Sequence, residues 1–333
     1  MSTTSRPAAE AGSAAARTVA GPVAGATTLT VSGPDATGFL QGQLANDVAG
    51  LPVGGARRSL YLNHKGHALA EAMVVRLARD EYVLVEEGGA AAWMKAEFER
   101  HVIFDDVRVV GPTPVRLVTL LAAPVEVGGV GAALGDGVDV VFSRAFGVDA
   151  PAAERVVTLA GGFAYPSGRS ALGGYDVVSR MDQDDLPVLS EAGAALATPS
   201  ELTRIRVRAC AALAPQDAGE GVLPQEAGLE GALSYRKGCY LGQEIMARIE
   251  ARGNVRRALA HVRLAGDPRP RGEPPGPDGE AWRELRAGGR TVGRLGTVVE
   301  AEDGGFEALA VMRSDVAEAT PVTTASGIAV RRL

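Results

Sequence analysis

The chain has 333 residues, of which 46% are hydrophobic and 22% charged, and its formal net charge is −6. This length favours two or three domains, and the composition is that of an ordinary globular protein rather than a disordered or fibrous one. The acidic balance argues against nonspecific binding of nucleic acid, so we expect no direct nucleic-acid partner.

The first half of the chain predicts an α+β arrangement. Residues 1–18 are rich in Ala, Ser and Thr without a hydrophobic period, which predicts a disordered tail. A strand is expected at 27–32, a turn at 33–35 and a helix from 36 to 47. A hairpin of strands at 73–77 and 82–86, a helix at 90–101 and strands at 107–110 and 116–121 follow. This order suggests a ferredoxin-like sandwich, with a plain antiparallel sheet and one covering helix as the alternative.

The sequence pattern of the last quarter of the chain indicates a separate all-β domain. Residues 264–280 are dense in proline, glycine and charge, which is typical of a loop or linker. Strand-like runs at 282–287, 290–300 and 306–312 are separated by glycine-rich turns, so we expect a small terminal β-barrel.

The number of cysteines and the hydropathy of the chain indicate the cellular compartment in which the protein is expected. Cys210 and Cys239 are too few for a disulfide framework or for a complete zinc site, so a reducing compartment and no resident metal are expected. No apolar stretch reaches the roughly 18 residues of a transmembrane helix, and the first 18 residues lack the apolar centre of a signal peptide. We expect a soluble cytoplasmic protein without a membrane partner.

Polar residues crowd into the segment 235–244, which reads YRKGCYLGQE and is followed by Arg248 and Arg256. Glycines on both sides of Cys239 permit close approach of a ligand, and Lys237 adds positive charge. Glu244 can pair with Arg248 four residues later if this stretch is helical. The alternative is structural: Cys239 would be a small packed residue and Gly242 a device that starts a helix.

The letters KGCYLGQE at 237–244 resemble the KGCYxGQE signature of the YgfZ family, within the folate-binding aminomethyltransferase superfamily of the glycine-cleavage T-protein. Residues 39–47, FLQGQLAND, are similar to that family's FLQGQxTND stretch, with Ala45 in place of Thr. The shorter segments Lys65-Gly66, 174–177 (GYDV) and 223–226 (LPQE) also fit.

The resemblance implies a three-domain ring with ferredoxin-like α+β parts, a C-terminal β-barrel and a central folate-sized hole lined by the KGCY segment. We assign residues 19–50 and 140–255 to a discontinuous folate-binding domain, 51–139 to a ferredoxin-like domain and 256–333 to the barrel.

The same resemblance implies site residues. A carboxylate can accept from the neighbouring N–H and amino groups of a pterin, which makes Asp176 the first candidate. The other implied cofactor-binding residues are Tyr175, Arg204, Glu226, Tyr240, Gln243, Glu244, Arg248 and Arg256, of which Arg204, Arg248 and Arg256 are candidates for the anionic folate tail. Arg206 stands where the superfamily often has glutamate, so the role of that position is open.

The implied function is that of a tetrahydrofolate-binding factor that supports assembly or repair of iron–sulfur clusters in client enzymes, including tRNA-modifying ones. The cofactor would be tetrahydrofolate or a one-carbon derivative, and the partners would be client enzymes or assembly proteins. Cys239 would be the reactive thiol, activated by Lys237.

The main alternative is a folate-dependent aminomethyltransferase of the T-protein type. Where transferases carry paired aspartates, this chain has Ala70-Glu71, which argues for an accessory factor rather than a turnover enzyme. A demethylase or oxidase fragment would need a flavin partner, and the chain lacks the Gly-x-Gly-x-x-Gly fingerprint of dinucleotide binding. A pure interaction module is a further alternative.

Overall fold

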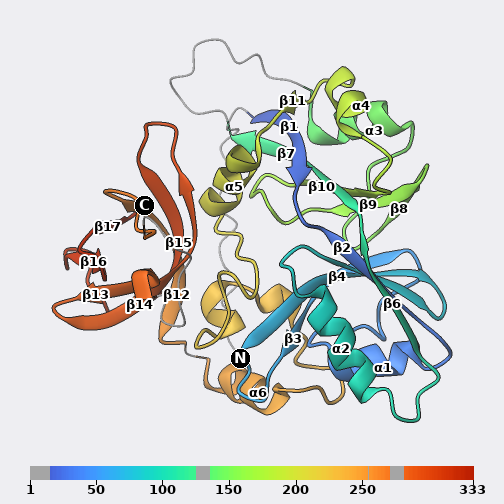
Figure 1. Ribbon diagram of the computed structural model, residues 1–333, viewed down its shortest axis with the longest axis horizontal. Helices are drawn as coiled ribbons and strands as arrows, with labels where there is room; N and C mark the ends of the chain where they lie inside the picture. Colours follow the sequence, from blue (N-terminus) through green and yellow to red (C-terminus); the bar gives the residue numbers. More distant parts are fainter. Residues whose placement is uncertain (1–15, 125–135, 254, 271–280) are drawn as a thin grey trace.

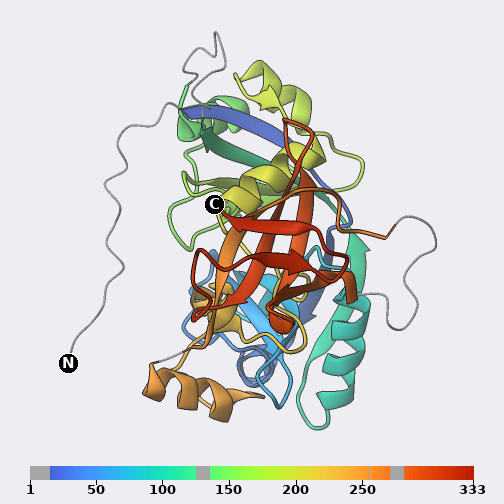
Figure 2. The same ribbon diagram turned by 90° about the vertical axis from the view of Figure 1, so that its left-hand side faces the viewer.

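A computed structural model describes residues 16–124, 136–253, 255–270 and 281–333. Two β-sheets lie one above the other, and a closed β-barrel stands beside them (Figure 1). Figure 2, turned by 90°, has the barrel in front of both sheets. No helix in the described ranges is long and apolar enough to cross a bilayer.

The first sheet, which we call the N-terminal sheet, is wholly antiparallel, with strand order β3-β4-β5-β2-β6. Two helices cover one face, where the rings of Phe39 and Phe98 meet edge to face at 5.7 Å. The order of elements carries one strand more than a four-stranded ferredoxin-like unit. Its elements are β2 (Thr27–Ser32), α1 (Ala36–Gln43), β3 (Gly55–Leu62), β4 (Ala68–Ala78), β5 (Glu81–Glu86), α2 (Ala91–His101) and β6 (Arg108–Pro114).

The second sheet, the middle sheet, has the order β11-β1-β7-β10-β9-β8, and only the β1–β11 pair is parallel. Helices α3 and α4 cover its outer face through Phe142 and Leu189. Its other face packs on the N-terminal sheet, where Val75 and Val83 meet Leu117 and Val178. The elements are β1 (Ala16–Val23), β7 (Arg116–Pro124), α3 (Val138–Phe146), β8 (Val157–Leu159), β9 (Gly162–Pro166), β10 (Gly174–Ser179), α4 (Leu186–Glu191) and β11 (Ala195–Leu196).

A mainly helical segment connects the middle sheet to the barrel, which closes because β17 pairs with β12. Leu285 and Leu295 are buried inside the barrel. The connecting elements are α5 (Pro199–Arg208), η1 (Pro224–Ala227), η2 (Glu230–Ala232) and α6 (Gln243–Arg252); the barrel contains β12 (Arg257–Leu264), η3 (Ala281–Arg283), β13 (Glu284–Ala287), β14 (Arg290–Glu300), β15 (Phe306–Arg313), β16 (Val322–Thr324) and β17 (Ala329–Arg332).

The α+β class and the terminal barrel are confirmed, and several details differ from the sequence expectations. Helix α1 ends at Gln43 because Leu44 adopts an extended backbone. Residues 16–18 of the expected tail belong to β1, whereas 1–15, and 271–280 of the expected linker, lie outside the described residues.

Sheet membership also divides the chain differently from the domains assigned above. Strand β2 and helix α1 lie with the strands of the 51–139 segment, while β7, from that segment, lies in the middle sheet. The physical reason is hydrogen bonding: β2 pairs with β5 and β6, and β7 pairs with β1 and β10.

Three arginines of α5 tie the sheets to the barrel. Arg204 donates to the Glu300 carbonyl, at 3.1 Å, and Arg208 forms a bidentate pair with Glu307 at 2.8 and 2.9 Å. Arg206, the residue in place of the expected glutamate, is buried and pairs with the fully buried Asp217 at 2.8 Å.

Asp217 also accepts hydrogen bonds from the barrel. Its Oδ1 accepts from the backbone N–H and the hydroxyl of Thr297, at 2.6 and 2.8 Å, and its Oδ2 accepts from the Leu213 backbone N–H at 2.9 Å. A Cβ atom on Gly296 would lie 2.3 Å from the same Oδ1. The carboxylate therefore joins α5, the loop after it and β14 in one buried network.

We predict that Asp217→Asn lowers the free energy of unfolding by about 3 kcal/mol, because Arg206 is left as a buried charge without its counterion. The measurement is urea unfolding followed by circular dichroism. The control is Asp315→Asn, which breaks the exposed pair with Arg313 at 2.5 Å and should leave the midpoint nearly unchanged. Equal, small shifts for both variants would contradict a structural role for the network.

Candidate functional site

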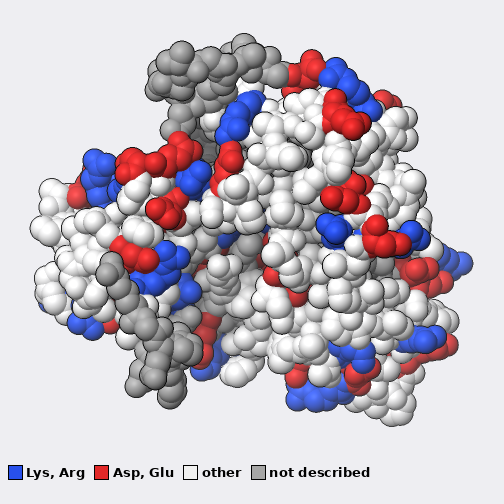
Figure 3. All heavy atoms as spheres, turned by 45° about the horizontal axis from the view of Figure 1, so that its top comes forward, with Lys and Arg blue, Asp and Glu red and all other residues white. Residues whose placement is uncertain are grey.

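A cavity of about 830 Å³, the central cavity, lies where the two sheets meet α5 and the barrel. Its wall combines residues of β4 and β5, of β9 and β10, of α5 with the loop 211–220, and of β14. The N-terminal sheet, the middle sheet and the barrel therefore all contribute to one cavity. On the face shown in Figure 3, acidic and basic side chains are intermingled.

Asp176, the first sequence candidate, lies on β10 in the wall of the central cavity. Its side chain is 7% exposed, and its two oxygens accept from Arg169 Nε at 3.2 and 3.3 Å. Arg169 Nη2 also donates to Glu87 at 2.6 Å. Burial alone would lower the pKa of Arg169, but Asp176 and Glu87 outweigh it and raise that pKa. The wall thus carries two carboxylates bridged by one guanidinium.

A further carboxylate in the wall of the central cavity is that of Glu71 on β4, at the position compared above with the transferase aspartates. It pairs with Arg58, which also donates to the Ala212 carbonyl. The other Glu71 oxygen accepts from the Ala214 backbone N–H at 2.8 Å. Both oxygens of this carboxylate are therefore engaged in holding β3, β4 and the loop after α5 together.

Lys237 joins the two motifs that carried the sequence resemblance. Its ammonium donates to the backbone carbonyls of Gln41, Leu44 and Asn46, all in the 39–47 motif. Burial lowers the pKa of Lys237 to about 8, against the opposing charge of Asp47, so the amine is still mostly protonated at pH 7. All three N–H bonds of the ammonium are directed at these carbonyls, so Lys237 fixes the position of the 237–244 segment against the 39–47 motif.

The rest of the 237–244 segment lies away from the central cavity. None of its residues is among those of the described chain that line that hollow, so the expected lining by the KGCY segment is not found. Cys239 and Leu241 are exposed, whereas Tyr240 is buried with its ring 4.8 Å from the Lys237 ammonium. Burial raises the pKa of Tyr240 to about 12.

Gly242 is the N-cap of α6, as the structural alternative expected. It has φ = +84°, and a Cβ there would lie 2.7 Å from the Asn63 carbonyl oxygen, so only glycine fits. Gln243 begins the helix and its amide donates to the Lys237 carbonyl at 3.5 Å. The expected helical pair of Glu244 and Arg248 forms at 3.0 Å, with both side chains largely exposed.

The other sequence candidates lie in three different places. Tyr175 points away from the central cavity, because side chains alternate along a strand, and its hydroxyl donates to Asp139 at 2.5 Å. Arg204 serves the α5–barrel contact described above. Glu226 and Arg256 line a second hollow between η1, α6 and the barrel, where Glu226 pairs with Arg257 at 2.7 Å.

Sequence reasoning missed most of the polar residues of the central cavity. They reach it from parts of the chain that are far apart: Arg58 from β3, Glu87 from the position after β5, and Arg169 from the loop between β9 and β10. No motif marks them. The nearest signal is the position of Arg169, seven residues before Asp176 and directly after a glycine.

The comparisons with known proteins agree with one another. Residues 6–124 match the family model described as the GCVT N-terminal domain. The YgfZ tRNA-modifying protein of Edwardsiella ictaluri is 27% identical over 298 residues, covering 86% of this chain and 82% of that protein. The protein of the same name from Sodalis glossinidius is 25% identical over 291 residues, covering 87% and 83%.

Among solved structures, the glycine cleavage system aminomethyltransferase T of Bartonella henselae has the same fold. The TM-score is 0.71 at 19% sequence identity, over 95% of this chain and 85% of that one. Together these matches confirm the resemblance found in the sequence: the chain is similar to YgfZ tRNA-modifying proteins over most of its length and has a GCVT-type fold.

Proposed function

We propose that this protein binds tetrahydrofolate, or a one-carbon derivative of it, in the central cavity with the pterin ring against Asp176. The observation that carries the proposal is the buried Asp176 carboxylate in the wall of a hollow of about 830 Å³, within the range of small-molecule sites. A pterin presents a ring N–H and an amino group side by side, and a carboxylate can accept from both.

Arg169 suits the same ring. Its Nε and Nη2 are bonded to Asp176 and Glu87, while its Nη1 makes no hydrogen bond within the described part of the chain. In a pterin, the ring N–H lies between the amino group and a carbonyl oxygen. A wall with a carboxylate acceptor beside a guanidinium donor therefore matches the donor and acceptor order of that edge.

We propose an accessory role rather than turnover. Both oxygens of Glu71 are taken up by Arg58 and a backbone N–H, and Asp176 is paired with Arg169, so neither carboxylate stands ready as a general base. The aminomethyltransferase alternative has one observation in its favour, namely that Glu71 and Asp176 line the same cavity.

The accessory role would be support of iron–sulfur cluster assembly or repair in client enzymes, including tRNA-modifying ones, in keeping with the name of the YgfZ relatives. Cys239 and Leu241 are exposed just before α6, where a partner protein can reach them. One thiol cannot hold a cluster, which usually needs about four ligands, so a partner would supply the others.

The folate proposal predicts that Asp176→Asn raises the dissociation constant for tetrahydrofolate about 10- to 100-fold, because the amide cannot accept both pterin hydrogens as a charged partner. Isothermal titration calorimetry on the full chain measures this. Asp182→Asn, which alters an exposed pair with Arg180 at 3.1 Å, is the control. Unchanged affinity in a folded Asp176→Asn protein would remove Asp176 from the site.

The thiol proposal predicts that Cys239→Ala abolishes complementation of a strain lacking the protein, while the fold and folate affinity stay nearly intact. Cys210→Ala is the matched control, because Cys210 is also exposed and outside any disulfide. Complementation by Cys239→Ala at the level of Cys210→Ala would show that the reactive-thiol role is wrong.

A further inference from the structure

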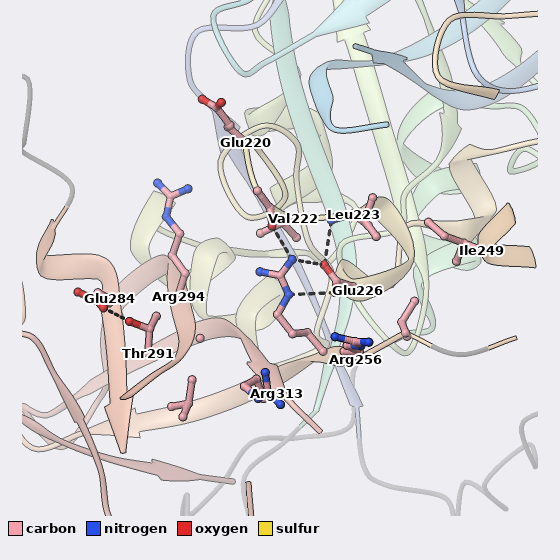
Figure 4. Close-up of a pocket in the computed structure, with 15 residues that line it drawn as sticks. Glu220, Val222, Leu223, Glu226, Ile249, Arg256, Glu284, Thr291, Arg294 and Arg313 are labelled. Atoms are coloured by element: carbon pink, nitrogen blue, oxygen red, sulfur yellow. Dashed lines mark hydrogen bonds and ion pairs between the residues drawn. The ribbon is translucent and has the colours of Figure 1, made fainter. Parts of the chain in front are cut away.

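The loop between α2 and β6, residues 102–107, exposes two consecutive large apolar side chains, and we call it the apolar loop. Ile103 is 72% exposed and Phe104 is 98% exposed. Neither residue lines the central cavity or the second hollow, which is shown in Figure 4. A single exposed apolar residue is ordinary, but a phenyl ring held almost wholly in water adds nothing to the stability of this fold. The ring is therefore available for burial against another molecule.

The apolar loop is fixed to the first turn of α1. The Asp106 backbone N–H donates to Asp35 Oδ2 at 2.8 Å, and the N–H of Asp35, the N-cap of α1, donates to the Asp106 carbonyl at 3.5 Å. At the other end of α1, the Gln41 carbonyl accepts from the ammonium of Lys237, two residues before Cys239. A helix of this length spans about 12 Å. The apolar loop and the exposed thiol therefore flank one short helix.

The surface of α1 between these two points carries almost no side chains. Gly38 and Gly42 are four residues apart and both exposed, and a Cβ atom on either would meet nothing within 4 Å. Neither has a positive φ, so no contact or backbone conformation in the described chain requires glycine there. Glycine inside a helix is less favourable than alanine, and it permits close approach of another molecule to the backbone. This bare face of α1 therefore suits a partner that packs directly on the helix.

The charge around the apolar loop indicates the chemistry of the partner. Asp35 and Asp106 are hydrogen-bonded to each other's backbone, and Gly33 donates to the Asp80 carbonyl at 3.0 Å, so these strand and helix ends meet. The charged residues there are five acidic and two basic, none of them in an ion pair within the described part of the chain: Asp35, Asp80, Glu81, Asp105, Asp106, Arg79 and Arg108. An acidic surface is repelled by anionic lipid and attracted to lysine and arginine on a protein.

We propose that the apolar loop, the bare face of α1 and the Cys239 segment form one docking face for the partner protein, with the Phe104 ring in an apolar pocket that has lysine or arginine at its rim. This inference rests on the proposed accessory role and names where its partner binds. Two contact points about 12 Å apart fit within a standard interface of about 800 Å² per partner. Buried aromatic side chains carry much of the binding energy of such interfaces.

The first test is complementation of a strain lacking the protein by the full chain under a titratable promoter. We expect Phe104→Ala to require at least about ten-fold more protein than the wild type for half-maximal growth, because the interface loses its aromatic anchor. Phe104→Tyr keeps the ring and should require less than about three-fold more. The control is Leu196→Ala: Leu196 is 59% exposed on β11, which lies at the opposite end of the molecule from α1 and α2 (Figure 1). The urea midpoint and tetrahydrofolate affinity of Phe104→Ala should equal those of the wild type.

Gly42→Gln separates docking from folding. Glutamine is a better helix former than glycine, so this variant should fold at least as stably as the wild type, while its side chain blocks the bare face of α1. It should require at least about ten-fold more protein for half-maximal growth. Ser190→Gln, which adds the same side chain to an exposed position of α4, should behave as the wild type.

Photo-crosslinking in growing cells identifies the occupant. With p-benzoylphenylalanine in place of Phe104, we expect an adduct with another protein at an apolar surface flanked by lysine or arginine. The adduct should disappear in the Gly42→Gln background and should not form from position 196.

An adduct with lipid or with a second copy of this chain, or equal protein requirements for Phe104→Ala and Leu196→Ala, would overturn the docking face. If Cys239→Ala still failed to complement in that case, the thiol role of the proposed function would stand. Full complementation by Cys239→Ala beside a loss with Phe104→Ala would remove the thiol role and keep the docking contact at the apolar loop.

Discussion

The buried hydrogen-bond network around the Asp217 carboxylate is the interaction on which the position of the barrel, and so the shape of the central cavity, depends. The carboxylate accepts from Arg206 of α5, from the backbone of Leu213 and from Thr297 of the barrel, and it is fully buried. Arg206 and Thr297 themselves line the central cavity. Because a buried charge without its counterion is strongly destabilising, this network fixes where the barrel sits against the sheets. Arg294, on the same barrel strand as Thr297, lines both hollows.

A second constraint joins the 237–244 segment to the 39–47 motif. The Lys237 ammonium bonds three carbonyls of the 39–47 motif, and the Asn46 side chain donates to the Arg58 and Gly231 carbonyls. Two motifs almost 200 residues apart are therefore one structural unit. Cys239 lies at the surface, whereas Asp176 lies in the wall of the central cavity. In the proposed function, the thiol therefore contacts a partner protein and the cavity binds the folate.

The electrostatics of the central cavity support the proposed accessory role. Three carboxylates in its wall are matched by guanidinium groups: Asp176 and Glu87 by Arg169, and Glu71 by Arg58. A ligand that presents neighbouring N–H groups adds to such a network without requiring an unpaired charge. Catalysis by proton transfer would need one of these pairs to open first, which the surrounding hydrogen bonds oppose.

The sequence by itself determined the α+β class, the terminal barrel, helix α2, the helical pairing of Glu244 with Arg248 and the resemblance to the YgfZ family. These features are readable because local periodicity, turn residues and a contiguous motif encode them. Only the tertiary structure decided that Asp176 faces the central cavity while Tyr175 does not, that Arg206 serves a buried ion pair, and that Arg169 stands between two carboxylates. Strand pairing and domain packing bring these groups together from distant parts of the chain, and no local pattern in the sequence records those contacts.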